Sequence, residues 1–280
     1  MSASALASSP TLTLADGHAA PQLGLGVWLM PADITAERVR TALEIGYRLV
    51  DTAAAYENEA GVGEGIRASG IPRSEVFVTT KLWNSHHDYD EALRAFDKSL
   101  QRLQMDYVDL YLIHWPVPTR DRYIDAWRAL VRLQEEGRAR SIGVCNFMVE
   151  HLRRIIGETG VIPVVNQVEL HPQFQQTELR SFHASKGIVT QSWSPLGHGR
   201  LLKHPELARI AARHGKTPPQ AIIRWHLDSG LMVIPKSARP ERIAENFEVF
   251  DFRLDDEDLA AIAKLDSPGG RHGADPLTFQ

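Results

Sequence analysis

Short β-rich runs alternate with amphipathic segments of helical period along most of this 280-residue chain. The strand patterns begin near Leu23, Arg48, Val76, Val108, Ala139, Val164, Ile188 and Leu231. The clearest helical patterns span residues 33–45, 89–103, 123–134 and 218–227. Eight strands, each followed by a helix, is the count of a (β/α)8 TIM barrel, and its strands are covered on both faces. The alternation therefore predicts an α/β barrel formed by residues 1–280 as a single domain.

A doubly wound parallel sheet is the alternative fold for such an alternation. It usually carries a glycine fingerprint after its first strand, but Gly24 and Gly26 lack the third glycine of that motif. Two additions to the barrel are expected: an N-terminal β-hairpin over residues 11–18 and an extra C-terminal helix over residues 255–265. The first ten or so residues, 1–10, are expected to form a loose tail.

The charge balance and the single cysteine limit the partners and the compartment. Thirty-one basic and thirty-five acidic residues give a formal net charge of −4, which offers no general attraction to nucleic acid or to an anionic membrane. No apolar run approaches the roughly 20 residues that span a bilayer. Cys145 has no partner for an intramolecular disulfide, as is usual in a reducing compartment. We expect a soluble, cytoplasmic protein.

Three polar residues stand where apolar strand patterns end. Asp51, Lys81 and His114 close three consecutive runs, and Tyr56 follows Asp51 by five residues. Because parallel strands of a barrel meet at one rim, these four side chains should gather there. Taken singly, each has a structural explanation, such as a helix cap for Asp51 or a core imidazole for His114. Their occurrence at consecutive strand ends favours a shared site.

A tyrosine beside a lysine is a proton donor suited to a carbonyl oxygen. The hydroxyl of Tyr56 keeps its proton at neutral pH, and an adjacent ammonium on Lys81 should lower its pKa. Asp51 would keep Lys81 charged, and His114 would orient the substrate oxygen or help to pass the proton. Reduction of a carbonyl also needs a hydride, which no side chain supplies. It would therefore require a nicotinamide cofactor.

With these residues in place, the sequence resembles the aldo-keto reductase family. The motifs are DTAAAYENE (51–59), KLW (81–83), IHWP (113–116), SIGVCNF (141–147), NQVELHP (166–172) and IPKS (234–237). The likeness extends from about residue 12 to residue 266. The segments QSWSPLG (191–197) and VFDF (249–252) are most similar to those of bacterial 2,5-diketo-D-gluconic acid reductases.

The resemblance implies roles for particular residues. Tyr56 would be the general acid, Lys81 and Asp51 its tuning pair, and His114 the residue that orients the carbonyl. NADPH would lie extended across the barrel mouth, held by Asn146, Gln167, Trp193, Ser194, Leu196, Gly197, Lys236, Ser237, Arg239, Arg242, Glu245 and Asn246. Within that set Asn146 and Gln167 would bind the carboxamide, Trp193 would stack on the nicotinamide, and Glu245 and Asn246 would face the adenine. Most relatives carry serine where this chain has Cys145, and a thiol is a weaker hydrogen-bonding group.

The basic residues after the eighth strand favour the phosphorylated cofactor independently. Lys236, Arg239 and Arg242 lie within seven residues of one another, just before and inside a helix start that itself favours anions. The substrate would contact His114 and three tryptophans beside the expected site, Trp28, Trp83 and Trp115. Twelve histidines show no HExxH motif, and we predict no metal.

We therefore predict an NADP-dependent reductase of small aldehydes and ketones, including keto sugars such as 2,5-diketo-D-gluconate. The resemblance implies a monomer. One alternative is a regulatory protein that binds the cofactor but turns over weakly, although the intact set of Asp51, Tyr56, Lys81 and His114 argues against it. A metal-dependent barrel hydrolase would need inward histidines on the first strand, and residues 23–28 contain none.

Overall fold

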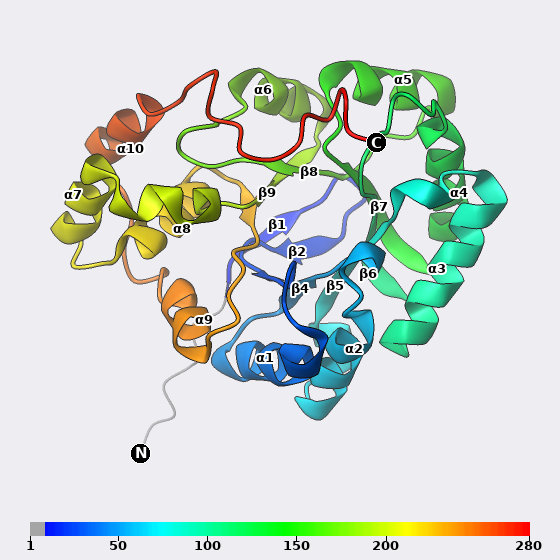
Figure 1. Ribbon diagram of the computed structural model, residues 1–280, viewed down its shortest axis with the longest axis horizontal. Coiled ribbons are helices and arrows are strands. Elements are labelled where there is room, and N and C mark those ends of the chain that lie inside the picture. Colours follow the sequence, from blue (N-terminus) through cyan, green and yellow to red (C-terminus); the bar gives the residue numbers. More distant parts are fainter. Residues whose placement is uncertain (1–8) are drawn as a thin grey trace.

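Eight parallel strands form the centre of the computed structural model, which describes residues 9–280 (Figure 1). They are β3 (Leu25–Gly26), β4 (Leu49–Asp51), β5 (Phe77–Leu82), β6 (Val108–Ile113), β7 (Ala139–Cys145), β8 (Val165–Glu169), β9 (Val189–Trp193) and β10 (Met232–Val233). Neighbours in sequence are neighbours in the sheet. Single bridges join Leu23 to Val233 and Gly26 to Lys236, so the first and last strands also meet and the barrel closes.

Helices form a ring outside the strands. Those that follow successive strands are α1 (Ala32–Ile45), α2 (Glu59–Ala68), α3 (Tyr89–Leu103), α4 (Tyr123–Glu135), α5 (Val149–Thr159), α6 (Thr177–Lys186), α8 (Pro218–Asp228) and α9 (Pro240–Phe247). Two further helices are α7 (Pro205–Arg213) and α10 (Asp256–Ala263). Within residues 9–280 there are also four short 3-10 helices: η1 (Ala54–Tyr56), η2 (Arg73–Glu75), η3 (Asn84–His86) and η4 (Gly197–Lys203).

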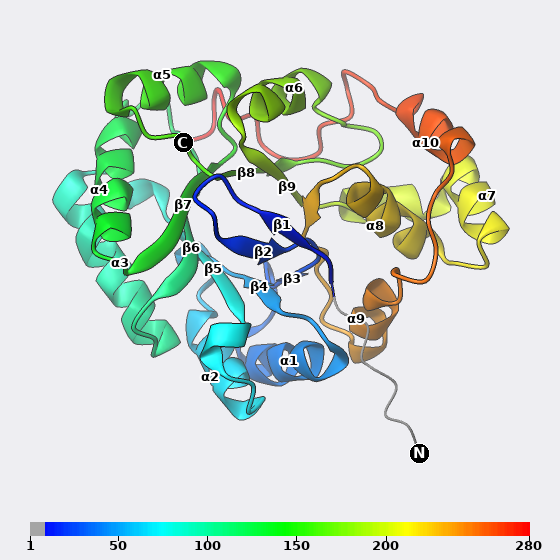
Figure 2. The ribbon, with the colours of Figure 1, turned by 180° about the vertical axis from the view of Figure 1, so that it is seen from behind.

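The predicted barrel, its hairpin and its C-terminal helix are confirmed. The hairpin consists of β1 (Thr11–Thr13) and β2 (Ala19–Pro21), and Figure 2 shows it lying across one end of the barrel. The predicted tail lies mostly outside the described residues. Its last two members are held, because the Ser9 hydroxyl accepts the Leu23 N–H and the Pro10 carbonyl accepts the Gln22 N–H. In the described part of the chain, no helix is long and apolar enough to cross a membrane.

Two-residue alternation along the strands decides which side chains enter the barrel. Leu110 and Leu112 of β6 belong to an interior cluster, whereas Tyr111 and Ile113 pack with the helices. The hairpin residues Leu14 and Ala20 belong to the same interior cluster, so the hairpin plugs the amino-terminal end. The carboxyl end of the strands is therefore where a site can open to solvent.

Candidate active site

The same alternation carries polar side chains into the carboxyl end of the barrel. Leu49 and Phe77 are members of the interior cluster, so Asp51 and Lys81, two and four residues further along, also point inward. Val165 places Gln167 and Glu169 inward by the same count on β8. Apolar positions deep in the barrel and polar positions near its rim produce a polar layer above a hydrophobic floor.

The Lys81 ammonium is the hub of this layer. It is completely buried and donates to Asp51 Oδ1 at 2.5 Å, to the Thr52 carbonyl at 2.9 Å and to Tyr56 Oη at 3.4 Å. An ammonium has three donors, and all three are engaged. Although burial alone lowers the pKa of Lys81, the charge of Asp51 and then Tyr56 raise it above its ordinary value. Lys81 is therefore a fixed cation beneath the phenol.

Tyr56 and His114 face the cavity beside this cation. The two rings lie edge to face with centroids 5.6 Å apart, and the rings of Trp83 and His114 also lie edge to face, with centroids 5.2 Å apart. Burial, followed by the charge of Lys81, holds the pKa of His114 well below its usual range. Its Nδ1 has no hydrogen-bond partner among the described residues. His114 is thus a neutral imidazole with hydrogen-bonding capacity to spare.

The expected effect of Lys81 on Tyr56 is confirmed in direction, but it is not the largest influence on the pKa of Tyr56. Lys81 does lower the pKa of the phenol, as its charge requires, but burial is the larger influence and raises it to about 12. Tyr56 therefore holds its proton firmly, and the low-polarity surroundings make the phenolate costly. Lys81 reduces that cost without removing it.

The residues expected at the nicotinamide end are joined to the catalytic set. Gln167 Nε2 donates to Asp51 Oδ2 at 2.7 Å, and Asn146 Nδ2 donates to the His114 carbonyl at 3.0 Å. The indole N–H of Trp193 donates to Asn146 Oδ1 at 2.9 Å. Asn146 and Ser194 adopt positive φ angles of 62° and 48°, a region that non-glycine residues occupy at some cost. Such strain is frequent where backbone must present groups to a ligand.

A cavity of about 1030 Å³ opens over these residues. The predicted site residues that line it are Trp28, Asp51, Tyr56, Trp83, His114, Trp115, Asn146, Gln167, Trp193, Ser194 and Lys236. Lys81 lies just beneath it. The remaining predicted cofactor residues, Leu196, Gly197, Ser237, Arg239, Arg242, Glu245 and Asn246, do not line the cavity itself. Their roles stay predictions, as do those of the catalytic set.

The basic residues at the edge of the cavity and just beyond it are exposed. Lys236, Arg239 and Arg242 form none of the ion pairs found within residues 9–280. Arg239 directly precedes α9, whose amino-terminal end favours an anion. Glu245 is already engaged, because its carboxylate accepts a hydrogen bond from Thr217 at 2.6 Å. The donor set fits a phosphate at the α9 end of the cavity.

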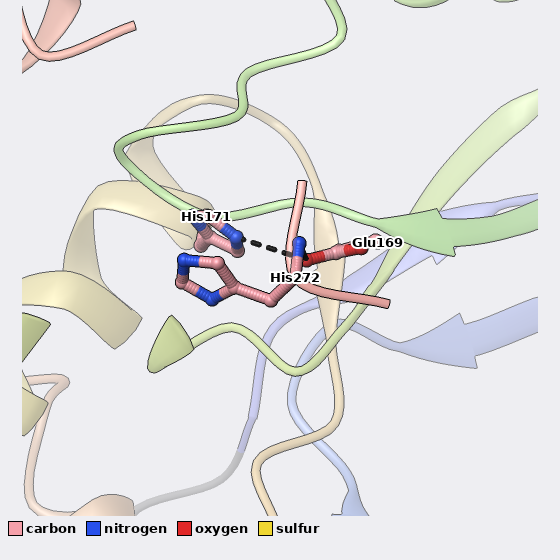
Figure 3. A group of neighbouring side chains, drawn as sticks. All are labelled: Glu169, His171 and His272. Carbon is pink, nitrogen blue, oxygen red and sulfur yellow. Dashed lines mark hydrogen bonds and ion pairs between the residues drawn. The ribbon is translucent and has the colours of Figure 1, made fainter. Parts of the chain in front are cut away.

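Sequence reasoning missed a group at the opposite rim. Glu169, the last residue of β8, lies against His171 and against His272 from the segment that follows α10 (Figure 3). One ligand-type atom from each lies within 4.8 Å of the others. No local motif marks this grouping, because 100 residues lie between His171 and His272. His272 also lines the cavity, together with Gly273 and Phe279.

Comparison with known proteins identifies the family. A model of the aldo/keto reductase family matches residues 21–267. An aldo-keto reductase of Mycolicibacterium smegmatis is 56% identical over 271 residues, which cover 97% of this chain and 98% of that protein. The methylglyoxal reductase DkgA of Escherichia coli K12 is 52% identical over 276 residues, covering 98% and 99%. The chain belongs to the aldo/keto reductase family, as the resemblance in its motifs predicted.

Solved structures agree with this assignment. A mutant of Gox0644 in complex with NADPH superposes with a TM-score of 0.94 at 52% identity, covering 97% of this chain and 99% of that one. An aldo-keto reductase of Bombyx mori in complex with NADP superposes with a TM-score of 0.87 at 36% identity, covering 93% and 94%.

Proposed function

We propose that the protein uses NADPH to reduce aldehyde and ketone carbonyls of small molecules, with Tyr56 as the proton donor. One observation carries the proposal: the Tyr56 hydroxyl lies 3.4 Å from a buried Lys81 that Asp51 keeps charged, at the floor of a cavity walled by tryptophans. NADPH supplies the hydride when it is bound. Related proteins that bind NADPH or NADP, and the free cations at 236–242, support that choice of cofactor.

The side chains of this chain then divide the work. Negative charge that develops on the substrate oxygen draws the proton from Tyr56, and Lys81 stabilises the phenolate that remains. Neutral His114 donates a hydrogen bond to the same oxygen and so fixes its position. Trp83 and Trp115 exclude water, which strengthens these interactions. When NADPH is bound, Asn146 and Trp193 would hold its nicotinamide end.

The substrate proposal stays at the level of small, reactive carbonyl compounds. Methylglyoxal is one candidate, since 52%-identical relatives carry that name, and keto sugars such as 2,5-diketo-D-gluconate are another. The chain is proposed to act as a monomer in the cytoplasm.

The test is NADPH oxidation with a panel of aldehydes and diketones by the wild-type protein and by Tyr56→Phe. The expected result is turnover by the wild type and a loss of at least roughly 100-fold in the variant, with NADPH binding retained. Turnover that survives in Tyr56→Phe would eliminate Tyr56 as the acid. Tight NADPH binding without turnover of any carbonyl by the wild type would instead favour the regulatory alternative.

A further inference from the structure

The segment that follows α10 returns across the open end of the barrel. In Figure 1 it is the red chain that passes over the strands and ends near α5. Its first part is anchored by the Ser267 N–H, which donates to the Gln173 carbonyl, and by Asp266, which accepts the Gln175 N–H. Within the described residues, only two hydrogen bonds and no ion pair join residues 271–280 to the rest of the protein. Both end on Glu169.

Glu169 is built to accept them. The His272 N–H donates to Oε1 at 2.7 Å and the Gly273 N–H donates to Oε2 at 2.8 Å, while His171 Nε2 lies 3.2 Å from Oε1. The residue is 1% exposed, so its carboxylate has little contact with water and depends on these donors. Although burial raises the pKa of Glu169, the hydrogen bonds from His171, Gly273 and His272 together lower it. The carboxylate is ionised, and both of its oxygens accept hydrogen bonds.

The two hydrogen bonds to Glu169 hold residues 271–280 against the candidate active site. A Cβ atom on Gly273 would lie 2.4 Å from Cη2 of Trp193 and 3.0 Å from Glu169 Oε2, so only glycine permits this approach. Further along, the Phe279 ring packs on Trp115 with centroids 4.2 Å apart. The segment therefore contacts both Trp193, which is proposed to hold the nicotinamide, and Trp115, which is proposed to line the substrate pocket.

A bridging metal is the competing interpretation of the group. One carboxylate and two imidazoles are ligands that zinc accepts. Both oxygens of Glu169, however, already accept backbone N–H groups. The rings of His171 and His272 are stacked, with 24° between their planes, so their in-plane lone pairs do not converge on a common point. Figure 3 shows the two rings side by side, with only His171 directed at the carboxylate. The arrangement fits a hydrogen-bonded clasp, in which the Glu169 carboxylate accepts the N–H groups of His272 and Gly273, better than a metal centre.

We propose that Glu169 is a positioning residue whose carboxylate holds residues 271–280 against Trp193 and Trp115, so that they form a fixed wall at the substrate end of the cavity. The inference rests on the proposed function for its kinetic consequence only. When the clasp opens, the wall retreats, and carbonyl substrates are bound less tightly while the proton donor and its cation remain in place.

The first readout does not need turnover. The peptide bond between Arg271 and His272 is a trypsin site, and its amide N–H is the one bonded to Glu169 Oε1. Release of the peptide 272–280, followed by mass spectrometry, therefore reports opening of the clasp. Glu169→Gln should accelerate this release at least roughly tenfold, because a neutral amide accepts less strongly and its NH2 group opposes one N–H donor. Glu135→Gln, which neutralises an exposed carboxylate on α4, should match the wild type. Equal release rates for Glu169→Gln and wild type would overturn the proposal.

The second readout is kinetic. In Glu169→Gln the KM for the carbonyl substrate should rise about tenfold with kcat changed less than about threefold. Deleting residues 272–280 should reproduce that rise, and combining the deletion with Glu169→Gln should add nothing further, since both act through one contact. Additive effects would show that Glu169 acts by another route. If the wild type oxidises no NADPH, the proposed function fails, and the proteolysis result still decides the clasp.

Two further experiments cover a misfolded Glu169→Gln variant and a bound metal. Gly273→Ala keeps the carboxylate but displaces the segment, so it should reproduce both readouts even if Glu169→Gln does not fold. An unchanged release rate in Gly273→Ala would count against the clasp. EDTA should change neither readout of the wild type. Release accelerated by EDTA and restored by zinc would replace the hydrogen-bonded clasp with a metal bridge.

Discussion

Lys81→Met should destabilise the protein by about 3 kcal/mol, because it leaves a buried carboxylate without its cation. Lys81 and Asp51 are 0% and 1% exposed, so neither charge is hydrated in the folded protein. Methionine is of similar length and fills the channel of the lysine stem, which limits any cavity. The variant loses three hydrogen bonds, to Asp51, Thr52 and Tyr56. What remains is an unpaired buried charge.

The size of this loss of stability depends on the hydrogen bond from Gln167 that Asp51 retains in the variant. Removing one partner of a buried ion pair costs about 3–5 kcal/mol. Gln167 Nε2 still donates to Asp51 Oδ2 at 2.7 Å, so the lower end of that range applies. The double variant Lys81→Met/Asp51→Asn buries no charge, and an asparagine oxygen can still accept from Gln167. It should therefore regain about 2 kcal/mol of the lost free energy of unfolding.

Urea unfolding followed by tryptophan fluorescence measures both effects, since the chain contains six tryptophans. A domain with an unfolding free energy of about 5–15 kcal/mol tolerates the loss and stays folded. A cost below about 1 kcal/mol for Lys81→Met, or a double variant no more stable than the single one, would refute the argument from a desolvated pair. Both variants should lose at least roughly 100-fold in kcat/KM while still binding NADPH, because the phenolate of Tyr56 loses its cation.

Three further outcomes are expected. His183 and His226 are buried, and burial is the main cause that lowers their pKa values to about 4. Between about pH 6.5 and pH 4 the unfolded chain therefore binds protons at these histidines that the folded protein does not bind. The free energy of unfolding should fall over this range by up to about 3 kcal/mol for each histidine, and urea unfolding at a series of pH values measures this. A Cβ atom on Gly63 would meet the Leu103 carbonyl at 2.0 Å, whereas one on Gly157 meets nothing, so Gly63→Ala should lower the melting temperature and Gly157→Ala should hold or raise it. Cys145 is fully buried with its pKa raised by burial, and a thiol reagent should label it only after unfolding.

The barrel could be predicted because its determinants are local and repeated. The expected helices at 33–45, 89–103 and 123–134 differ from the observed ones by a residue at most at either end. Strand pairing followed from the barrel itself, since the strands of a (β/α)8 barrel pair in sequence order, unlike those of a doubly wound sheet. The exception is α7, Pro205–Arg213, which lies between β9 and α8 and breaks the one-helix rule.

The predicted catalytic set could be located for the same reason. Asp51 and Lys81 stand at ends of consecutive strands, so the fold alone makes them neighbours. The clasp was not accessible, because Glu169 meets two backbone N–H groups 103 and 104 residues later, in a segment without strand or helix. Backbone donors carry no mark in the sequence. Only the glycine at 273 hinted at a close approach, and nothing indicated to what.

The pKa of Tyr56 shows how its proposed role depends on the residues around it, Lys81, Asp51 and His114. With a pKa of about 12, the phenol of Tyr56 is a weaker acid than free tyrosine, and burial is the cause. The same burial keeps His114 neutral, as its proposed role as a hydrogen-bond donor to the substrate oxygen requires. Exposing the site to water would lower the pKa of Tyr56 but would also weaken the field of Lys81. The proposed proton transfer from Tyr56 in this dry cavity therefore depends on the charge of Lys81, which Asp51 in turn maintains.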